Sequence, residues 1–122
     1  MNSKELEQRL IDFAVQIIEL TKTNKNNFAG NHLSGQIIRS STSAPLNYGE
    51  ARSVESSNDF IHKMQIVLKE LRETFVSLKI ISGAKLNSNI QFTDSLLKEN
   101  NELIAIFVKS IETSKNRKNK KA

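Results

Sequence analysis

The chain has 122 residues, of which 38% are hydrophobic and 25% charged, a size and composition that fit one small domain with a single core. It contains no cysteine, so disulfides and thiolate metal sites are excluded, and the reducing cytoplasm is the expected location. The first ten residues carry charges of both signs, and no run of about 18 apolar residues occurs, so we expect neither secretion nor a membrane span.

The formal net charge of +5 is concentrated at the C-terminal end. The last eight residues, KNRKNKKA, hold five of the 18 basic residues, which leaves 13 basic and 13 acidic residues in the rest of the chain. Because this segment has no large apolar side chain to bury, we expect residues 115–122 to form a disordered tail after a folded domain at residues 1–114. Such a tail either clamps nucleic acid through counterion release or only solubilises the terminus. Its basic residues are Lys115, Arg117, Lys118, Lys120 and Lys121.

The first predicted helix starts at the N-terminus and ends near Lys22. Asn2, followed by Glu5 three residues later, has the spacing of a capping box, in which side chains satisfy the free N–H groups of a first turn. Apolar residues then recur every three or four positions and indicate one core-facing stripe. The stripe consists of Leu6, Leu10, Phe13, Ala14, Ile17 and Ile18.

A loop is predicted at residues 23–30, where the apolar periodicity stops and asparagine is frequent. We expect Phe28 to fold back onto the core as an anchor. Asn31 is the predicted N-cap of the second helix. That helix contains Pro45, the only proline of the chain, which removes a backbone hydrogen bond and clashes with the carbonyl of Ser41 at a cost of roughly 3 kcal/mol.

The second helix carries a polar row on one face. Five polar residues recur at helical spacing between positions 36 and 50, and the spacing stays in phase across Pro45. We therefore favour one kinked, continuous helix; two short helices are the alternative. An apolar stripe lies beside the row, which indicates a buried hydrogen-bond network reaching the third helix, or a subunit contact. The network residues are Gln36, Arg39, Ser43, Asn47, Glu50 and Glu70.

The third helix is predicted to follow a turn at residues 53–58 and to end near Ser82. Ser56 and Asp59 have capping-box spacing, and Gly83 supplies a C-terminal stop. At about 1.5 Å per residue this helix is roughly 40 Å long. Val76 and Ile80 extend its apolar surface beyond what one packing face needs, which indicates a subunit interface.

The fourth helix is predicted after a loop at residues 84–87, with Ser88 and Gln91 again at capping-box spacing. Its apolar stripe consists of Phe92, Leu96, Leu103, Phe107 and Ile111. Four amphipathic helices joined by short connections, without strand-like alternation, predict an all-α fold, an antiparallel up-and-down four-helix bundle.

The pattern Gln36-x-x-Arg39-x-x-x-Ser43-x-x-x-Asn47-x-x-Glu50, followed by Asp59-Phe60 and by Glu70-Leu71, resembles the four-helix-bundle family of 23S ribosomal RNA intervening-sequence proteins. The resemblance covers roughly residues 5 to 112. It implies a small bacterial protein that assembles as a ring-like homopentamer and has no established enzymatic activity. Some members are encoded within intervening sequences of ribosomal RNA genes, and relatives act as nucleic-acid-binding accessory proteins of diversity-generating retroelements. The chain departs from the family pattern at Pro45, Ala51 and Val67.

Catalytic and cofactor chemistry has little support in the sequence. A di-iron bundle needs a Glu-x-x-His unit from each of two helices plus two further carboxylates, whereas Asp59-x-x-His62 occurs once. There is no Gly-rich phosphate loop and no cysteine nucleophile, and no histidine is spaced to serve Ser43 or Ser56 as a base. We therefore expect no catalytic residue, cofactor, metal or small-molecule substrate.

Two functions remain open. The first is a non-enzymatic homo-oligomer that binds RNA or DNA or acts as an accessory protein, and the second is an interaction scaffold for another protein without a direct nucleic-acid role. We interpret the polar network as structural. The candidate nucleic-acid-binding residues are Lys63, Lys69, Arg72 and Lys79 of the third helix, together with the five basic residues of the tail.

Overall fold

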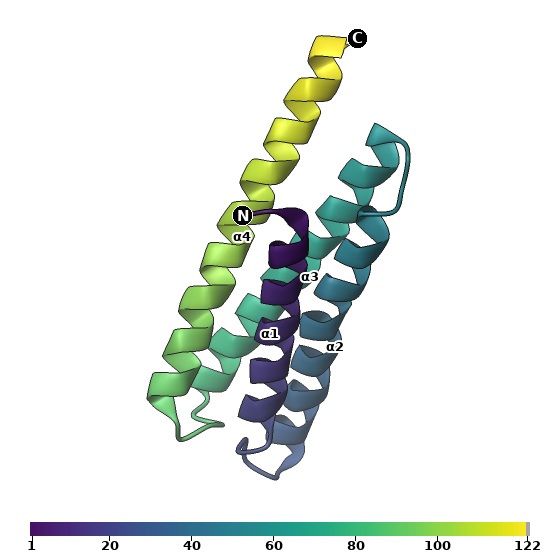
Figure 1. Ribbon diagram of the computed structural model, residues 1–122. Coiled ribbons are helices and arrows are strands. Elements are labelled where there is room, and N and C mark those ends of the chain that lie inside the picture. Colours follow the sequence, from purple (N-terminus) through teal and green to yellow (C-terminus); the bar gives the residue numbers. More distant parts are fainter. Residues whose placement is uncertain (122) are drawn as a thin grey trace.

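The computed structural model describes residues 1–121 as four helices connected by short loops. They are α1 (Ser3–Thr21), α2 (Phe28–Ala51), α3 (Ser57–Gly83) and α4 (Ile90–Lys121). Successive helices run in opposite directions, and α1 packs against α2 and α4 while α3 packs against the same two helices from the other side (Figure 1). The predicted all-α, up-and-down bundle is confirmed.

The core lies along the bundle axis and is formed by the apolar stripes of all four helices. Tyr48 and Phe107 meet inside it edge to face, with ring centroids 5.4 Å apart. The largest fully buried side chains are Phe13, Phe107, Leu10, Ile17, Leu20, Ile37, Met64, Leu71, Leu78, Ile81, Leu96 and Leu103. The predicted stripes thus face inward, because a helix can bury only the side that its periodic apolar residues occupy.

Two of the four predicted helix starts are correct. Asn2 accepts a hydrogen bond from the Glu5 backbone N–H at 2.8 Å, and Ser56 accepts one from the Asp59 N–H at 3.0 Å. The N-cap of α2 is Asn27 rather than the predicted Asn31, since the Asn27 side chain accepts from the Gly30 N–H at 2.7 Å. Helix α2 therefore begins about one turn earlier than predicted.

The start of α4 also differs from the prediction. Asn89, not Ser88, accepts from the backbone N–H of Phe92, three residues further along the chain, at 3.1 Å. Neighbouring polar residues with equal capping propensity explain why the sequence pattern misplaced this cap.

The prediction that Phe28 anchors the first loop is wrong. As the first residue of α2, Phe28 is 90% exposed. Its ring stacks parallel to that of His32, one turn further along the helix, with centroids 6.3 Å apart. The early start of α2 places this side chain on the outer face of the helix instead of in the loop.

Helix α2 runs without a break across Pro45, as predicted. Ala44 and Tyr48, on either side of the proline, are buried in the core, so packing against the neighbouring helices offsets the lost backbone hydrogen bond. One turn earlier, the Thr42 hydroxyl donates to the Ile38 carbonyl at 2.7 Å. Such side-chain bonds to the preceding turn are common where a helix departs from ideal geometry.

The predicted disorder of residues 115–122 is not what the structure shows for residues 115–121, which continue α4 as a helix to Lys121. Ala122 and the Lys121 side chain lie outside the described residues. Figure 1 shows this part of α4 projecting past the end of the bundle. Extending an existing helix is far easier than nucleating one, and Lys and Arg favour helix formation. Near its base, Lys118 donates a hydrogen bond to the Asn58 side chain of α3.

The opposite end of the bundle is closed by contacts between the α1–α2 and α3–α4 loops. The Lys25 N–H donates to the Leu86 carbonyl at 2.8 Å, and Asn24 and Asn87 form an isolated antiparallel bridge. The buried Asn87 side chain donates to the Leu20 carbonyl at 3.0 Å and to the Asn24 side chain at 2.8 Å. These two loops therefore form one connected unit.

Candidate functional site

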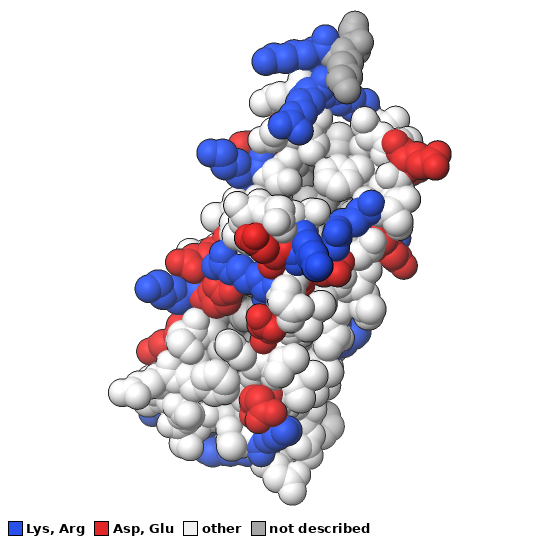
Figure 2. All heavy atoms as spheres, viewed as in Figure 1, with Lys and Arg blue, Asp and Glu red and all other residues white. Residues whose placement is uncertain are grey.

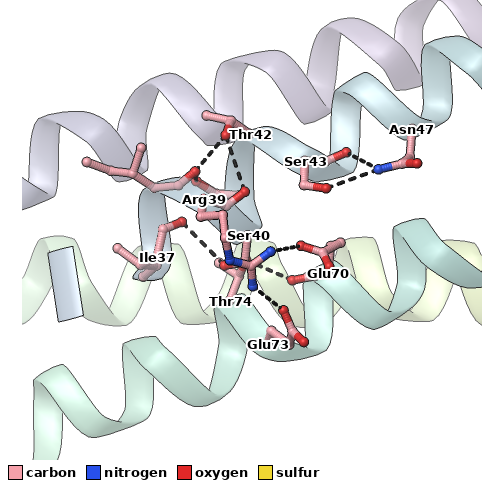
Figure 3. A network of polar contacts seen from close by, with 11 residues as sticks. Ile37, Arg39, Ser40, Thr42, Ser43, Asn47, Glu70, Glu73 and Thr74 are labelled. Carbon is pink, nitrogen blue, oxygen red and sulfur yellow. Dashed lines mark hydrogen bonds and ion pairs between the residues drawn. The ribbon is translucent and has the colours of Figure 1, made fainter. Parts of the chain in front are cut away.

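The best-defined polar site joins α2 to α3 through Arg39. Its Nη1 lies 3.1 Å from Oε2 of Glu70, and its Nη2 lies 2.6 Å from Oε2 of Glu73 (Figure 3). The Glu73 hydrogen bond and the charge of Glu70 raise the pKa of Arg39, so the guanidinium stays charged. Arg39 thus acts as a clamp between the helices.

Two buried hydroxyls lie beneath this clamp. The Ser40 and Thr74 hydroxyl oxygens are 2.7 Å apart, and the Thr74 hydroxyl donates to the Glu70 carbonyl at 2.9 Å. Ser40, Ser41 and Ala44 present little bulk to α3, and all three are buried. The two helices can therefore approach closely while their polar groups remain paired.

The other predicted network residues do not join Arg39. Asn47 donates to the Ser43 hydroxyl at 3.0 Å, a contact within α2. Glu50 pairs with Lys63 of α3 at 2.6 Å, and 60% of the Glu50 side chain is exposed. Gln36 makes no hydrogen bond to another described side chain and lies at the groove between α2 and α3 that is described below. The residues predicted to form one network thus form three separate contacts: Arg39 with Glu70, Asn47 with Ser43, and Glu50 with Lys63.

Sequence reasoning missed Glu73 and Thr74, the other α3 members of this site. Both lie within one turn of Glu70, at spacings of three and four residues, and that neighbourhood was the available signal. A second clamp was also missed. Arg9 of α1 contacts Glu99 of α4 at 2.6 Å and Glu102 at 3.0 Å, and the Glu99 hydrogen bond raises the pKa of Arg9.

A groove of about 650 Å³ lies between α2 and α3, beside the Arg39 clamp. We call it the α2/α3 groove. Its apolar wall is formed by Leu33, Val76 and Ile80, of which Val76 and Ile80 are exposed. Its polar lining consists of His32, Gln36, Arg39, Ser40, Lys69, Arg72, Glu73 and Ser77. The groove therefore combines an apolar wall with a largely basic rim.

The four basic residues predicted on α3 are not equivalent. Lys63 is engaged by Glu50, whereas Lys69 and Arg72 are exposed at the α2/α3 groove. Lys79 lies over the Phe75 ring, 5.7 Å from its centroid. None of the ion pairs within residues 1–121 uses Lys69, Arg72 or Lys79. These three cations face solvent and are available to a partner.

The basic residues after position 114 cluster around the projecting end of α4. Figure 2 shows Lys and Arg side chains gathered there, whereas charges of both signs mix along the middle of the same face. Lys115, Arg117, Lys118 and Lys120 are all exposed. Shallow hollows of about 300 Å³ and 290 Å³ separate this segment from the start of α3. We call residues 115–121 the basic extension.

The described residues offer no group that resembles a metal centre. No cluster of three or more His, Cys, Asp or Glu side chains occurs within residues 1–121, and His62 and Asp59 are exposed on the first turns of α3. Nor does any helix in that range have both the length and the apolar character needed to cross a bilayer.

Comparison with known proteins identifies the family. A family model described as 23S rRNA-intervening sequence protein matches residues 3–109. The chain belongs to this family. The match includes Arg39, Glu70 and Glu73 but ends before the basic extension, so the extension lies outside the part that the family model describes.

A solved structure has the same fold as this chain. It is the 1.70 Å crystal structure of a protein of unknown function from the S23 ribosomal protein family of Bacteroides thetaiotaomicron. The two chains share 29% sequence identity with a TM-score of 0.78, over 87% of this chain and 97% of the other. No curated protein matches the chain.

Proposed function

We propose that this protein is a non-enzymatic, self-associating nucleic-acid-binding protein of the cytoplasm, which acts as an accessory factor. The observation that carries the proposal is the basic extension, a helical segment that projects past the bundle with exposed cations on successive turns. The family membership supports a ribosomal RNA context. The ring-like homopentamer implied by the family resemblance is part of the same proposal.

A helical extension suits backbone recognition better than a disordered tail. Lys115 and Lys118 are three residues apart, so their side chains leave the same side of α4 about 4.5 Å apart along the axis. Because this backbone is already ordered, binding a phosphate chain costs less conformational entropy than folding a free tail would. Such contacts bind by counterion release and carry no base specificity.

The exposed cations of α3 form a second, weaker candidate surface. Lys69 and Arg72 face solvent at the α2/α3 groove, but Glu73 lies beside them and reduces the local positive potential. Lys63 is a poorer candidate than predicted, because its ammonium already contacts Glu50. The proposal therefore places most of the binding on the basic extension.

The test is a salt titration of RNA and DNA binding with charge-neutralised variants. The first variant, Lys115→Gln/Lys118→Gln/Lys120→Gln, keeps the extension helical and removes three charges. Its matched control, Lys22→Gln/Lys25→Gln/Lys85→Gln, removes three exposed lysines at the opposite end. Affinity for single-stranded and duplex probes is measured between about 50 and 200 mM salt, where phosphate contacts have their largest effect.

We expect the extension variant to bind more weakly and with a shallower dependence on salt. Three lost phosphate contacts reduce the slope of log affinity against log salt by up to roughly 2.7 units for duplex DNA. The control variant should match the unmodified protein. Equal slopes for all three proteins would move the binding to α3, and no binding at low salt would reject nucleic-acid binding.

One observation favours the alternative function, a scaffold for another protein. The α2/α3 groove has an exposed apolar wall, which nucleic-acid phosphates do not need. Three results together would favour the scaffold function. The unmodified protein would be monomeric, it would bind no nucleic acid, and substitution of Val76 and Ile80 would abolish its effect in the cell.

A further inference from the structure

We propose that the α2/α3 groove, together with the exposed rings of Phe28 and His32 at one end of it, is a binding site for single-stranded nucleic acid. Unpaired bases stack on the two rings and along the apolar wall, and the phosphates contact the cations of α3. This inference rests on the nucleic-acid binding in the proposed function. It adds a site that requires exposed bases, whereas the basic extension contacts phosphates alone. We call the two rings the aromatic pair.

Phe28 is the only exposed phenylalanine of the six, all of which lie within the described residues. Its side chain is 90% exposed, and its ring is parallel to the ring of His32, which is also exposed. A ring that buries so little surface adds little to the stability of the bundle. Exposed aromatic rings are the surfaces on which proteins stack unpaired bases, and every base has a flat face that can stack. The aromatic pair is therefore suited to single strands of any sequence.

The aromatic pair lies at one end of the α2/α3 groove. His32 is the first residue of α2 that lines the groove and Ile80 is the last from α3, so both lie at the same end of these antiparallel helices (Figure 1). From His32 the lining of α2 continues to Ser40, about 12 Å further at 1.5 Å per residue. A strand with one base on the aromatic pair can therefore continue along the groove.

The groove offers contacts that bases use and phosphates do not. Val76 and Ile80 are 56% and 47% exposed, and they provide an apolar surface for the face of a base or a sugar. Gln36 also lines the groove and makes no hydrogen bond to another described side chain. Its amide group can donate to and accept from the edge of an unpaired base.

The charges around the groove fit a polyanion. Helix α2 has no acidic residue before Glu50, and α3 has none after Glu73. Glu73 lines the groove, but it is paired with Arg39 at 2.6 Å, so it repels a phosphate less than a free carboxylate would. Three exposed α3 cations that no ion pair within residues 1–121 uses lie in or beside the groove: Lys69, Arg72 and Lys79.

The first test compares Phe28→Ala with two control variants. Phe28→Tyr keeps an aromatic ring, and Leu46→Ala removes an apolar side chain of α2 that is 70% exposed and does not line this groove. The probes are a single-stranded RNA, a duplex of the same sequence, and an abasic strand of the same length, which keeps the phosphates and lacks the bases. Fluorescence anisotropy measures affinity, and circular dichroism checks folding.

We expect Phe28→Ala to bind single-stranded RNA at least about fivefold more weakly, which is the lower end of the loss for one base stacked on an aromatic ring. Phe28→Tyr and Leu46→Ala should bind like the unmodified protein. For the duplex and the abasic strand, Phe28→Ala should also match the unmodified protein, because neither probe presents free base faces.

The dependence on salt separates the rings from the cations. Phe28→Ala removes no charge, so the slope of log affinity against log salt should not change. Lys69→Gln/Arg72→Gln should make the slope for single strands shallower by up to roughly 1.4 units. Lys98→Gln/Lys109→Gln is its matched control, since it removes two exposed lysines of α4 outside the groove.

A second test detects stacking directly. The chain has no tryptophan, so Phe28→Trp and Leu46→Trp each introduce a single fluorescent indole. Saturating single-stranded RNA should quench the emission of Phe28→Trp and leave that of Leu46→Trp unchanged. The abasic strand should quench neither.

Three results would overturn this inference and leave the proposed function intact. The first is unchanged affinity of Phe28→Ala for single-stranded RNA, or no quenching of Phe28→Trp at saturation. The second is an equal loss by Phe28→Ala for the abasic strand, which would show that the ring does not stack on bases. The third is an unchanged salt slope for Lys69→Gln/Arg72→Gln, which would show that the strand does not follow the groove.

The same variants identify another occupant of the groove. If Phe28→Ala alters sedimentation of the protein and not RNA binding, a second copy covers the groove and the inference is wrong. If Lys69→Gln/Arg72→Gln loses binding of polyglutamate and not of RNA, the groove takes an acidic protein segment and the inference is again wrong. If the unmodified protein binds no probe at low salt, the proposed function fails together with this inference.

Discussion

Arg39 and Glu70 contact each other across the α2–α3 interface at 3.1 Å, although 55% of the Arg39 side chain is exposed and only 7% of the Glu70 side chain. The pair is therefore asymmetric. Removing the arginine leaves a buried carboxylate without its cation, whereas removing the carboxylate leaves a guanidinium that still reaches water and Glu73.

This asymmetry predicts that Arg39→Ala is more destabilising than Glu70→Gln. A buried polar group left without its partner costs about 1–3 kcal/mol, and a buried charge costs more. Because the arginine is half exposed, solvent already weakens the pair, and we expect a loss of about 1–3 kcal/mol. The double variant should recover much of the loss, because no buried charge remains. Urea unfolding with each variant measures the free energies.

Lys63→Ala is the control for this prediction. It breaks the ion pair with Glu50, whose side chain is 60% exposed and is left in contact with solvent, so the expected change is below about 1 kcal/mol. A loss from Lys63→Ala equal to that from Arg39→Ala would show that exposure does not determine the cost of these pairs.

Gly30→Ala should strongly destabilise the protein. A Cβ atom at this position would lie 1.8 Å from the Lys25 carbonyl oxygen, a backbone atom that cannot move without rearranging the loop. Strain of this kind costs a few kcal/mol. Thermal unfolding of Gly30→Ala and Gly35→Ala compares the two sites.

Gly35→Ala is predicted to have the opposite effect. No atom lies within 4 Å of a Cβ built at Gly35, and alanine favours the helix interior by about 1 kcal/mol. A lower melting temperature for Gly35→Ala would contradict the prediction.

Tyr48 should make stability depend on alkaline pH. Burial raises the pKa of Tyr48, and the charge of Arg52 partly opposes that effect. The folded pKa is therefore above the unfolded value of about 10, so this contribution to stability is fully present below pH 10 and is lost as pH rises through the folded pKa. Because Tyr48 is the only tyrosine and tryptophan is absent, tyrosinate absorbance follows its titration directly.

Tyr48→Phe tests the same point from the stability side. This variant keeps the edge-to-face contact with Phe107 and has no group to ionise. Its stability should fall less between about pH 9 and 11 than that of the unmodified protein. Parallel losses, together with an unshifted tyrosinate titration, would contradict the assigned pKa direction.

Asn100→Leu should stabilise the bundle by about 1–2 kcal/mol. Asn100 is fully buried on α4, and its Nδ2 donates to the Leu71 carbonyl at 3.0 Å. Its Oδ1 has no hydrogen-bond partner among residues 1–121, so a desolvated acceptor is removed by the substitution. Chemical denaturation measures the gain. A loss instead would indicate that the amide fixes the register of α3 against α4.

Apolar periodicity was sufficient to predict the four helices, because each buries the one face that its regular spacing defines. Helix starts were harder to place. Asn26, Asn27 and Asn31 are all capable N-caps, and sequence alone does not indicate that the Gly30 N–H donates to Asn27. Spacing within one helix also could not reveal that Arg39 reaches Glu73, since that contact depends on the rotation of α3.

The basic extension shows why composition alone did not predict a helix at residues 115–121. Its composition indicated disorder because its charged side chains bury nothing, but composition takes no account of the helix that precedes it. Once α4 has formed, each added residue gains a backbone hydrogen bond without a new nucleation cost. Residues 115–121 are thus helical because they continue the preceding turns of α4, which pack in the core.

The joined loops at the far end of the bundle make the two helical hairpins open together. The Asn87 side chain donates hydrogen bonds to Leu20 and Asn24, and the Lys25 N–H donates to the Leu86 carbonyl. The α1–α2 loop and the α3–α4 loop therefore cannot unfold separately without breaking the hydrogen bonds between them. Backbone amides there should exchange with solvent deuterium as one cooperative unit. At the end that carries the basic extension, two side-chain contacts join the α2–α3 connection and the start of α3 to the terminal parts of the described chain. They are the Arg52–Glu7 ion pair at 3.2 Å and the hydrogen bond from Lys118 to Asn58, and neither links two loops, so fraying should begin there.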